Sequence, residues 1–272
     1  MILKNSCRLC YGSTQETFSR IVLNKYKVKY FRCLDCESLQ TEQPYWLDEA
    51  YENNIAYIDT GGGRRAIENI ATTYAIMKLY TLFNHLDFGG GDGLLCRLCR
   101  DIGINSYVHD KFAFPSYAQG FSIPNFQNPD IITAFEVIEH FSDPAREILK
   151  LFSLNSTIVL LSSEIYNSQD SDWSYLAPET GQHIFFFSKK SIESLASRQG
   201  FNVFFSGNYI LFVRKDVYSK TRSTISRVLL SSALKLPLRF FVLSRPNYYA
   251  DVDSNALREN FSKRSGSHSQ KS

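Results

Sequence analysis

Short apolar runs alternate with amphipathic stretches through the middle and the carboxyl-terminal half of the chain. The segments 130–144 and 156–164 each hold a run of apolar, β-branched residues and then turn polar, which is typical of strands buried in a parallel sheet. Segment 188–201 has a helical pattern that Ser188 caps and Gly200 ends. The stretch NVFFSGNYILFVRKD that follows predicts a final pair of strands. This alternation predicts an α/β fold in which helices flank a mostly parallel sheet.

Glycines break the chain between one apolar run and the next predicted helix. Residues 86–93 read LDFGGGDG. Gly89, Gly91 and Gly93 permit positive φ angles and let the backbone approach a ligand closely. The helix that follows offers unpaired N–H groups at its start. A strand, glycine turn and helix in this order predict a site for a nucleotide-like cofactor, although a tight turn without a ligand would use the same glycines.

Two acidic residues end the predicted strands beside these glycines. Asp87 precedes the turn, where a carboxylate suits a cationic amino-acid group better than a pyrophosphate. Asp110 ends the stretch SYVHD, about 20 residues past the glycines. A carboxylate at the tip of the second strand can accept both hydroxyls of a ribose. A ribose and a cationic amino-acid group are therefore the expected ligands.

These motifs resemble those of a known enzyme family. The spacing Asp87-x-Gly89-x-Gly91-x-Gly93 is similar to motif I of the Rossmann-like S-adenosylmethionine-dependent methyltransferases, and EVIEH within 130–144 is similar to the fourth-strand motif of the small-molecule methyltransferases. The resemblance covers about residues 86–216 and implies a Rossmann-like sheet with S-adenosylmethionine as its cofactor. The residues predicted to bind this cofactor are Asp87, Gly89, Gly91, Gly93, Asp110, Phe112, Phe135 and Glu136.

The resemblance is incomplete between Asp110 and Asp130. Only nineteen residues intervene, three of them prolines, where the family usually has a helix, a third strand and an acid beside the adenine. The prolines and the usual lengths of such elements leave too little room for both. We therefore expect an apolar clamp on the adenine, supplied by Phe112 or Phe114.

The acceptor side of the site is expected in segment 171–188, SDWSYLAPETGQHIFFFS, which follows the predicted strand at 156–164. This segment and the EVIEH motif resemble bacterial methyltransferases of sugar and polysaccharide biosynthesis, including zinc-bearing nucleotide-sugar C-methyltransferases. The resemblance implies a sugar, nucleotide sugar or glycan acceptor. Methyl transfer often needs a base, for which imidazole is best tuned near neutral pH. The candidate catalytic residues are His183, His140 and Glu139; a buried, hydrogen-bonded histidine is the alternative for either histidine.

Two Cys-x-x-Cys pairs lie near the amino terminus, Cys7 with Cys10 and Cys33 with Cys36. Four thiolates in two such pairs make a tetrahedral zinc site, and segment 1–45 has too little apolar content to fold well without one. The spacing resembles a zinc ribbon. Disulfides are not expected, because no signal peptide opens the chain. We predict structural zinc for these four residues and apolar packing for the third pair, Cys96 and Cys99.

The motifs divide the chain into five predicted parts. In order they are a zinc-ribbon-like segment (1–45), a helical lead-in or cap (46–84), an S-adenosylmethionine-binding domain (85–216), a carboxyl-terminal helical extension (217–258) and a disordered tail (259–272). Segment 228–243 of the extension is amphipathic. Packing on the chain's own domain is favoured for it over a membrane surface or a partner enzyme. The tail is too polar to bury anything.

Composition changes this picture in two respects. No run of eighteen apolar residues occurs, so no transmembrane helix is expected, and a cytoplasmic protein is predicted, with contact at the inner face of the membrane as an option. The net charge of +3 hides twelve Lys and Arg against four Asp and Glu from Arg214 onward. This basic end leaves open a zinc-ribbon RNA methyltransferase. However, the fourth-strand motif is not of the Asn-Pro-Pro-Tyr type, so nucleic acid is not the expected partner. A non-catalytic cofactor-binding scaffold is the third alternative.

Overall fold

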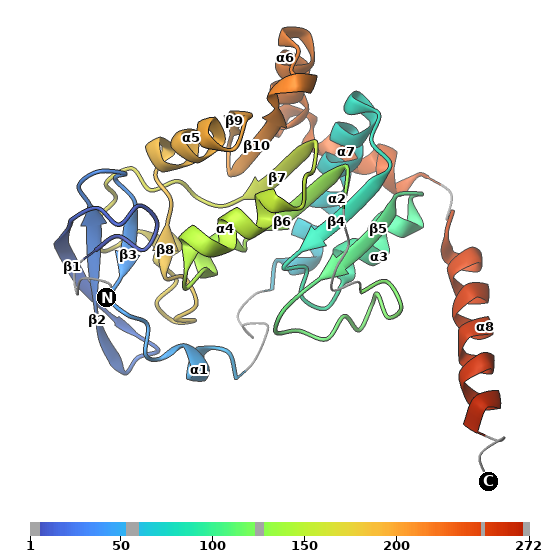
Figure 1. Cartoon of the computed structure of the whole chain (residues 1–272), viewed down its shortest axis with the longest axis horizontal. Helices are drawn as coiled ribbons and strands as arrows, with labels where there is room; N and C mark the ends of the chain where they lie inside the picture. The colour runs from blue at the N-terminus through green and yellow to red at the C-terminus, as the bar shows by residue number, and fades with distance from the viewer. Residues whose placement is uncertain (1–5, 53–59, 123–127, 246–247, 269–272) are drawn as a thin grey trace.

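Two β-sheets form the frame of the molecule (Figure 1). The computed structural model describes residues 6–52, 60–122, 128–245 and 248–268. The larger sheet consists of β4 (Asn84–Phe88), β5 (Asn105–His109), β6 (Ile131–Phe135), β7 (Ile158–Ser162), β9 (Phe201–Ser206) and β10 (Tyr209–Arg214). The smaller sheet consists of β1 (Thr14–Val22), β2 (Tyr26–Cys33), β3 (Leu39–Thr41) and β8 (Phe185–Phe186). The predicted α/β architecture is confirmed.

The larger sheet has the strand order β5-β4-β6-β7-β10-β9. Strands β5, β4, β6 and β7 run parallel, whereas β10 is antiparallel to both of its neighbours. The connection after β4 therefore leads to β5 on one side of it, whereas β6, which comes later in the chain, pairs with β4 on its other side. At such a switch point the loops after the two strands diverge, and the crevice at their carboxyl ends is where α/β sheets bind ligands.

Helices cover both faces of the larger sheet. They are α2 (Gly62–Tyr80), α3 (Leu94–Asp101), α4 (Pro144–Ser153) and α5 (Lys189–Arg198). Ile148 of α4 and Ile192 of α5 belong to the same buried cluster as Val159 of β7. Ile76 of α2 belongs to a second cluster with Ile158. Successive residues of β7 thus pack on opposite faces, which is why this strand is apolar throughout.

Helix α5 begins and ends where the sequence predicts, and α4 has a side-chain cap of the same kind. The carboxylate of Asp143 accepts a hydrogen bond from the backbone N–H of Arg146 (3.2 Å) at the start of α4. The hydroxyl of Ser188 accepts one from the N–H of Ser191 (3.0 Å) at the start of α5. Each side chain satisfies one of the N–H groups that a helix leaves unpaired. Gly200 follows α5 with a φ of +79°, as a helix end in the left-handed region requires.

The smaller sheet ties the amino-terminal segment to a distant loop. Its fourth strand, β8, pairs antiparallel with β3, so that Leu39 lies opposite Phe186. The guanidinium of Arg8 donates a hydrogen bond to the carbonyl of Ile184 (2.5 Å). These contacts hold the chain at Ile184 and at the two residues that follow it. Any loosening of the amino-terminal segment is therefore expected to reach His183, the preceding residue.

The region between Asp110 and Asp130 is short of regular structure, as predicted. Among its described residues no helix or strand is formed, and a single parallel bridge joins Ser122 to Val108 of β5. This bridge lies at the free edge of β5, where a third strand of a complete Rossmann-like sheet would pair. Residues 123–127 lie outside the described part of the chain.

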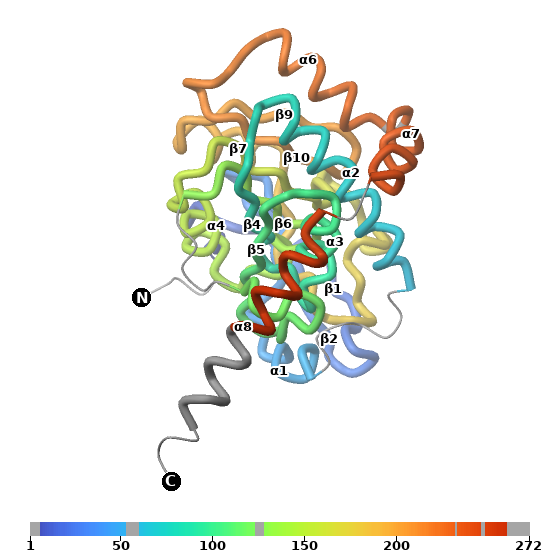
Figure 2. The backbone as a smooth tube through the Cα atoms, turned by 90° about the vertical axis from the view of Figure 1, so that its right-hand side faces the viewer, coloured from blue at the N-terminus to red at the C-terminus, as the bar shows by residue number. Residues whose placement is uncertain are grey.

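The carboxyl-terminal extension packs on α2. It consists of α6 (Lys220–Leu229), α7 (Ser232–Leu243) and α8 (Ala250–His268), and Figure 2 shows α7 beside α2. Val242 of α7 is fully buried, and Lys235 and Arg239 each approach Glu68 of α2 to 3.5 Å. In the structure, segment 228–243 therefore packs on the chain's own domain. In the described part of the chain, no helix is long and apolar enough to cross a membrane.

The chain remains helical beyond the boundary predicted for its tail. α8 extends to His268, which corrects the prediction of disorder for residues 259–268. Asp253, in the first turn, pairs with Arg100 at 2.6 Å and with Arg97 at 2.9 Å. This anchored turn is the costly nucleus of a helix, and each further residue then adds one backbone hydrogen bond without any need for burial. Residues 269–272 lie outside the described part.

Candidate active site

The glycine turn after β4 has the conformation that only glycine adopts readily. Gly89, Gly91 and Gly93 have φ angles of +69°, +56° and +82°. A Cβ at Gly89 would lie 2.7 Å from the side chain of Val137, whereas one at Gly91 would meet nothing within 4 Å. The turn is therefore closed on the side of Gly89 and open above Gly91. A ligand can approach the backbone there.

Asp87 lies beneath this turn. Its side chain is 2% exposed, and its Oδ1 accepts a hydrogen bond from the hydroxyl of Thr133 (3.1 Å). Its Oδ2 has no hydrogen-bond partner among the described residues. Burial raises the pKa of Asp87 to about 7. A buried carboxyl oxygen without a partner can pair with a cationic group of a ligand.

A buried polar network supports Asp87 from behind. The ring nitrogens of His85 lie 2.7 Å from the hydroxyl of Ser106 and 2.8 Å from that of Thr133. Burial lowers the pKa of His85 to about 3, so this imidazole is neutral. Three adjacent strands thus contribute one polar residue each. Sequence reasoning missed this network, although a histidine and a threonine inside apolar runs were visible signals.

Asp110 closes the glycine turn at the end of β5. One of its oxygens accepts a hydrogen bond from the N–H of Gly91 (2.9 Å), and the other accepts from the N–H groups of Phe112 (2.7 Å) and Ala113 (2.8 Å). The ring of Phe112 is 63% exposed and stacks on Tyr51 with centroids 5.4 Å apart. The predicted acid and the predicted clamp therefore lie together. Phe114 is also exposed.

Phe135 and Glu136 end β6 and differ in surroundings. The ring of Phe135 packs edge-on against Tyr209 at 6.0 Å, beside the buried cluster under α2. Glu136 has a φ of +54°, a strained conformation for a residue with a side chain. Its Oε1 accepts from the hydroxyl of Ser162 (2.7 Å) and its Oε2 from the phenol of Tyr175 (3.0 Å). The surrounding hydrogen bonds hold Glu136 in this strained position.

Glu139 is the second carboxyl in contact with Tyr175. Its side chain is 0% exposed, and its Oε1 lies 2.7 Å from the phenol oxygen. Burial and the charge of Glu136 hold the pKa of Glu139 well above its usual range. Tyr175 was part of the aromatic segment singled out in the sequence, but its role between two carboxyl groups was missed.

Two imidazoles complete the cluster. His140 Nδ1 lies 2.9 Å from the hydroxyl of Tyr51, and His183 Nδ1 lies 2.7 Å from the carbonyl oxygen of Tyr175. A carbonyl only accepts, so Nδ1 of His183 carries the proton and Nε2 keeps its lone pair. Burial lowers the pKa of both rings, that of His140 to about 3. The ring centroids are 5.0 Å apart. The three predicted catalytic residues are thus neighbours.

A continuous row of contacts joins the two halves of the site. It runs from the exposed ring beside the glycine turn to the strained carboxylate, through Phe112, Tyr51, His140, His183, Tyr175 and Glu136. Tyr51 links the expected cofactor side to the expected acceptor side. It precedes the segment 53–59, which lies outside the described residues.

The four amino-terminal cysteines converge as predicted. Their sulfur atoms all lie within 4.8 Å of one another, with 3.6 Å between Cys7 and Cys36 and 3.4 Å between Cys10 and Cys33. A tetrahedron with zinc–sulfur bonds of about 2.3 Å has edges of about 3.8 Å. The backbone N–H of Leu9 donates to the sulfur of Cys7, and that of Cys36 donates to the sulfur of Cys33, both at 3.4 Å. The hydrogen bond from Cys7 lowers the pKa of Cys36 to about 5. The set fits a tetrahedral ion.

Cys96 and Cys99 do not join that set. Both lie in α3 and are fully buried. Cys96 packs with Val108, and Cys99 belongs to the apolar cluster under α2. They behave as small apolar residues, in agreement with the prediction.

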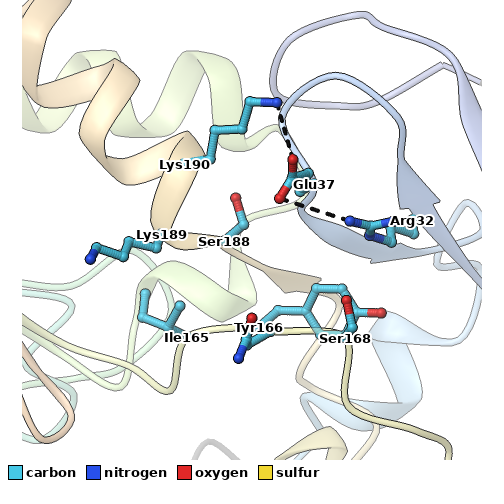
Figure 3. Close-up of a pocket in the computed structure, with 9 residues that line it drawn as sticks. Arg32, Glu37, Ile165, Tyr166, Ser168, Ser188, Lys189 and Lys190 are labelled. Atoms are coloured by element: carbon cyan, nitrogen blue, oxygen red, sulfur yellow. Dashed lines mark hydrogen bonds and ion pairs between the residues drawn. The ribbon is translucent and has the colours of Figure 1, made fainter.

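A separate hollow of about 310 Å³ lies between the smaller sheet and the start of α5. Figure 3 shows its charged lining, in which Arg32 and Lys190 both reach Glu37, at 3.8 Å and 3.1 Å. Lys189 adds a further positive charge. None of the residues of the glycine turn or of the Glu and His cluster lines it, so this hollow is distinct from the candidate active site.

The chain matches the family model described as a methyltransferase domain over residues 45–204. Similar solved structures include magnesium protoporphyrin IX methyltransferase from Synechocystis PCC 6803 with bound SAH, at 15% identity over 62% of this chain and 92% of that one, with a TM-score of 0.44. An O-methyltransferase family protein from Burkholderia thailandensis has 13% identity over 62% of each chain and a TM-score of 0.47. These likenesses are too distant to bear on the reaction. No curated protein matches the sequence.

Proposed function

Because the chain belongs to the methyltransferase-domain family, we propose that it transfers a methyl group from S-adenosylmethionine to a small-molecule acceptor. One observation carries this proposal. An open glycine turn, an acid at the tip of β5 and a cluster of neutral imidazoles and carboxyl groups meet at the carboxyl ends of adjacent parallel strands. The first two features fit a nucleoside with an amino-acid end, and the third fits the removal of a proton from an acceptor.

The residues around the glycine turn fit this cofactor. The space above Gly91 is open, and the carboxyl of Asp87 has one oxygen without a partner in the described part of the chain. Asp110 would accept the ribose hydroxyls, and the exposed ring of Phe112 offers an apolar face to the adenine. S-adenosylmethionine supplies a methyl group on a cationic sulfur. The chain's own residues bind and orient both reactants.

On the acceptor side, His183 is the residue to which we assign proton removal. Its Nδ1–H is committed to the carbonyl of Tyr175, so the neutral Nε2 is free to accept a proton. His140 and Glu139 lie against it and would position the acceptor. Glu136, which Tyr175 and Ser162 hold in place, would orient the methionyl end of the cofactor.

A sugar, nucleotide sugar or glycan is the acceptor class that we propose. Carboxyl, imidazole and phenol groups gather around the cluster, and a polyhydroxylated molecule can pair with each of them. The ring of Trp173, 5.5 Å from that of Tyr175, adds an apolar face on which a sugar ring can pack. The likeness of the 171–188 segment to sugar methyltransferases supports the same class.

Structural zinc at the four cysteines is part of the proposal. The sulfur separations fit a tetrahedral ion, and the backbone N–H groups that donate to sulfur favour the thiolate form. Zinc there would stabilise the turns that carry β1, β2 and β3. Through the pairing of β3 with β8, it would also hold the loop that ends at His183.

Calorimetry with S-adenosylhomocysteine tests the cofactor site. Gly89→Val places a branched side chain against Val137 at a φ of +69°, and Asp110→Ala removes charge-assisted hydrogen bonds worth several kcal/mol. Both should weaken binding, the glycine variant more severely. Gly207→Val is the control for the positive φ alone, because Gly207 (φ +56°) has nothing within 4 Å of an added Cβ and lies in the hairpin between β9 and β10. Unchanged affinity in both site variants would refute the site.

Transfer of a labelled methyl group tests the acceptor class. We expect label in nucleotide sugars or glycans supplied with the enzyme and labelled S-adenosylmethionine. Label in ribosomal RNA instead would support a nucleic-acid methyltransferase and refute the sugar acceptor. Tight cofactor binding with no transfer to any class of acceptor would favour a non-catalytic scaffold.

A further inference from the structure

Glu139, His140 and His183 have the composition of a metal site. One ligand atom from each lies within 4.8 Å of the ligand atoms of the other two. Two imidazoles and a carboxylate are donors that zinc, iron(II) and related divalent ions accept. Bonds of about 2.1 Å to a common ion hold such donors about 3 to 4 Å apart.

Each of the three residues has a second polar atom that is already engaged. His183 donates through Nδ1–H to the carbonyl of Tyr175 (2.7 Å), and His140 Nδ1 lies 2.9 Å from the hydroxyl of Tyr51. The Oε1 of Glu139 accepts from the phenol of Tyr175 (2.7 Å). Ligand histidines almost always have such a partner on the nitrogen that faces away from the metal. The carbonyl of Tyr175 fixes the ring of His183 and leaves its Nε2 for an ion.

Glu139 lacks the partner that its burial calls for. Its Oε2 is buried and has no hydrogen-bond partner among the residues that the structure describes. A buried carboxyl oxygen left in this state is costly unless a donor or a cation reaches it. His140 and His183 are less buried than Glu139.

We propose that Glu139, His140 and His183 bind one divalent transition-metal ion, at a site separate from the four cysteines. The metal site does not depend on the proposed function. Its effect on the reaction does rest on that function, because an ion on Nε2 of His183 would occupy the lone pair assigned to proton removal. Metal binding and methyl transfer would then exclude each other at this residue.

Cobalt(II) titration of the full chain, after the cysteine site has been filled with zinc, tests the proposal. We expect one further equivalent to bind and to give visible d–d bands without a thiolate-to-cobalt charge-transfer band. His183→Ala and Glu139→Gln should each lower the affinity for this equivalent at least about 10-fold. His109→Ala is the matched control, a partly buried histidine outside the cluster, and should keep wild-type binding.

Two results would overturn the site. One is saturation of the wild-type chain by the zinc already bound, with no further cobalt taken up. The other is wild-type cobalt affinity in both His183→Ala and His140→Ala. Circular dichroism checks that each variant is folded, and the isosteric Glu139→Gln variant carries the test if a histidine variant is not. The titration uses neither cofactor nor acceptor. A chain that binds cobalt here but not S-adenosylhomocysteine would refute the proposed function and leave the metal site standing.

Discussion

Two clusters of side chains suited to ligate a metal lie in the described part of the chain, and they are built differently. Cys7, Cys10, Cys33 and Cys36 come from two short turns, and their sulfurs contact one another and backbone N–H groups of the same turns. Glu139, His140 and His183 come from two loops of the larger domain, and their partners are tyrosines. The first cluster is self-contained. The second depends on side chains brought from elsewhere in the chain.

Because of this difference, we expect the cysteine cluster to stabilise the fold and the Glu and His cluster to take part in a reaction. Four thiolates fill the coordination of a tetrahedral ion and leave no position for a reactant. Two imidazoles and one carboxyl leave positions, or lone pairs, for a proton, an ion or an acceptor. Changes in the first cluster should therefore alter stability and activity together, whereas changes in the second should alter activity with little effect on stability.

The largest effect is expected from the double variant Cys33→Ser, Cys36→Ser. It should lose one zinc per chain, unfold several kcal/mol more easily because metal binding and folding are coupled, and lose turnover because β8 begins two residues after His183. Metal analysis, thermal unfolding and a methylation assay measure the three effects. The control is Cys96→Ala, Cys99→Ala, which changes a pair with the same spacing and should keep its zinc. Unchanged zinc in the serine variant would mean that the ligands lie elsewhere.

The second cluster should respond to His183→Ala in the opposite manner. Turnover should fall about 10²-fold because a base is lost, while cofactor affinity and thermal stability stay near those of the wild-type protein. Steady-state kinetics, calorimetry and thermal unfolding separate these quantities. A parallel loss of all three would indicate a structural histidine. Turnover at the wild-type rate would move the base to His140 or Glu139.

Tyr175→Phe should have a smaller effect on the same cluster. It removes the hydroxyl that contacts Glu136 and Glu139 but keeps the ring and the backbone carbonyl that holds His183. We expect turnover to fall about 10-fold, as for other groups that orient a site residue. Tyr45→Phe, at an exposed tyrosine, is the control and should leave turnover unchanged. An equal loss in the two variants would show that the phenol of Tyr175 has no special role.

The smallest effect concerns Asp87, a buried carboxyl that belongs to neither cluster. Burial raises its pKa from 3.8 to about 7 in the folded chain, so the folded state holds a proton that the unfolded state has released. Its contribution to stability is therefore complete below about pH 4 and is lost as the pH rises through 7. Between pH 6 and pH 8 the unfolding free energy should fall by about 1 kcal/mol. Asp87→Asn should abolish this part of the decrease, and an identical pH dependence in both proteins would contradict it.

Local patterns in the sequence predicted the parts of the molecule that local chemistry determines. The Cys-x-x-Cys turns, the glycines at positive φ and the cap at Ser188 all depend on neighbours within a few residues. Apolar runs likewise predicted the parallel strands, because most residues of a strand that is buried on both faces are apolar. The short spacing of Asp110 and Asp130 and the prolines between them predicted that no third strand forms there, and the described residues of this region contain none.

The contacts that assemble the acceptor side could not be predicted in this way. Tyr51 and His140 are 89 residues apart, and Tyr175 and Glu136 are 39 residues apart. Such pairs leave no periodic signal, because they meet only after the sheet has formed. The sequence therefore identified His183, His140 and Glu139 as candidates without the tyrosines that connect them. The helical state of residues 259–268 was missed for the same reason, since it depends on the distant pairing of Asp253 with Arg100.

A crystal structure of the chain with bound S-adenosylhomocysteine tests the central claim most directly. The account predicts the nucleoside over the glycine turn, with its ribose hydroxyls on the carboxylate of Asp110, its adenine against Phe112 and its sulfur facing His183. Density for the ligand elsewhere, or a glycine turn that stays empty at saturating ligand, would contradict the account.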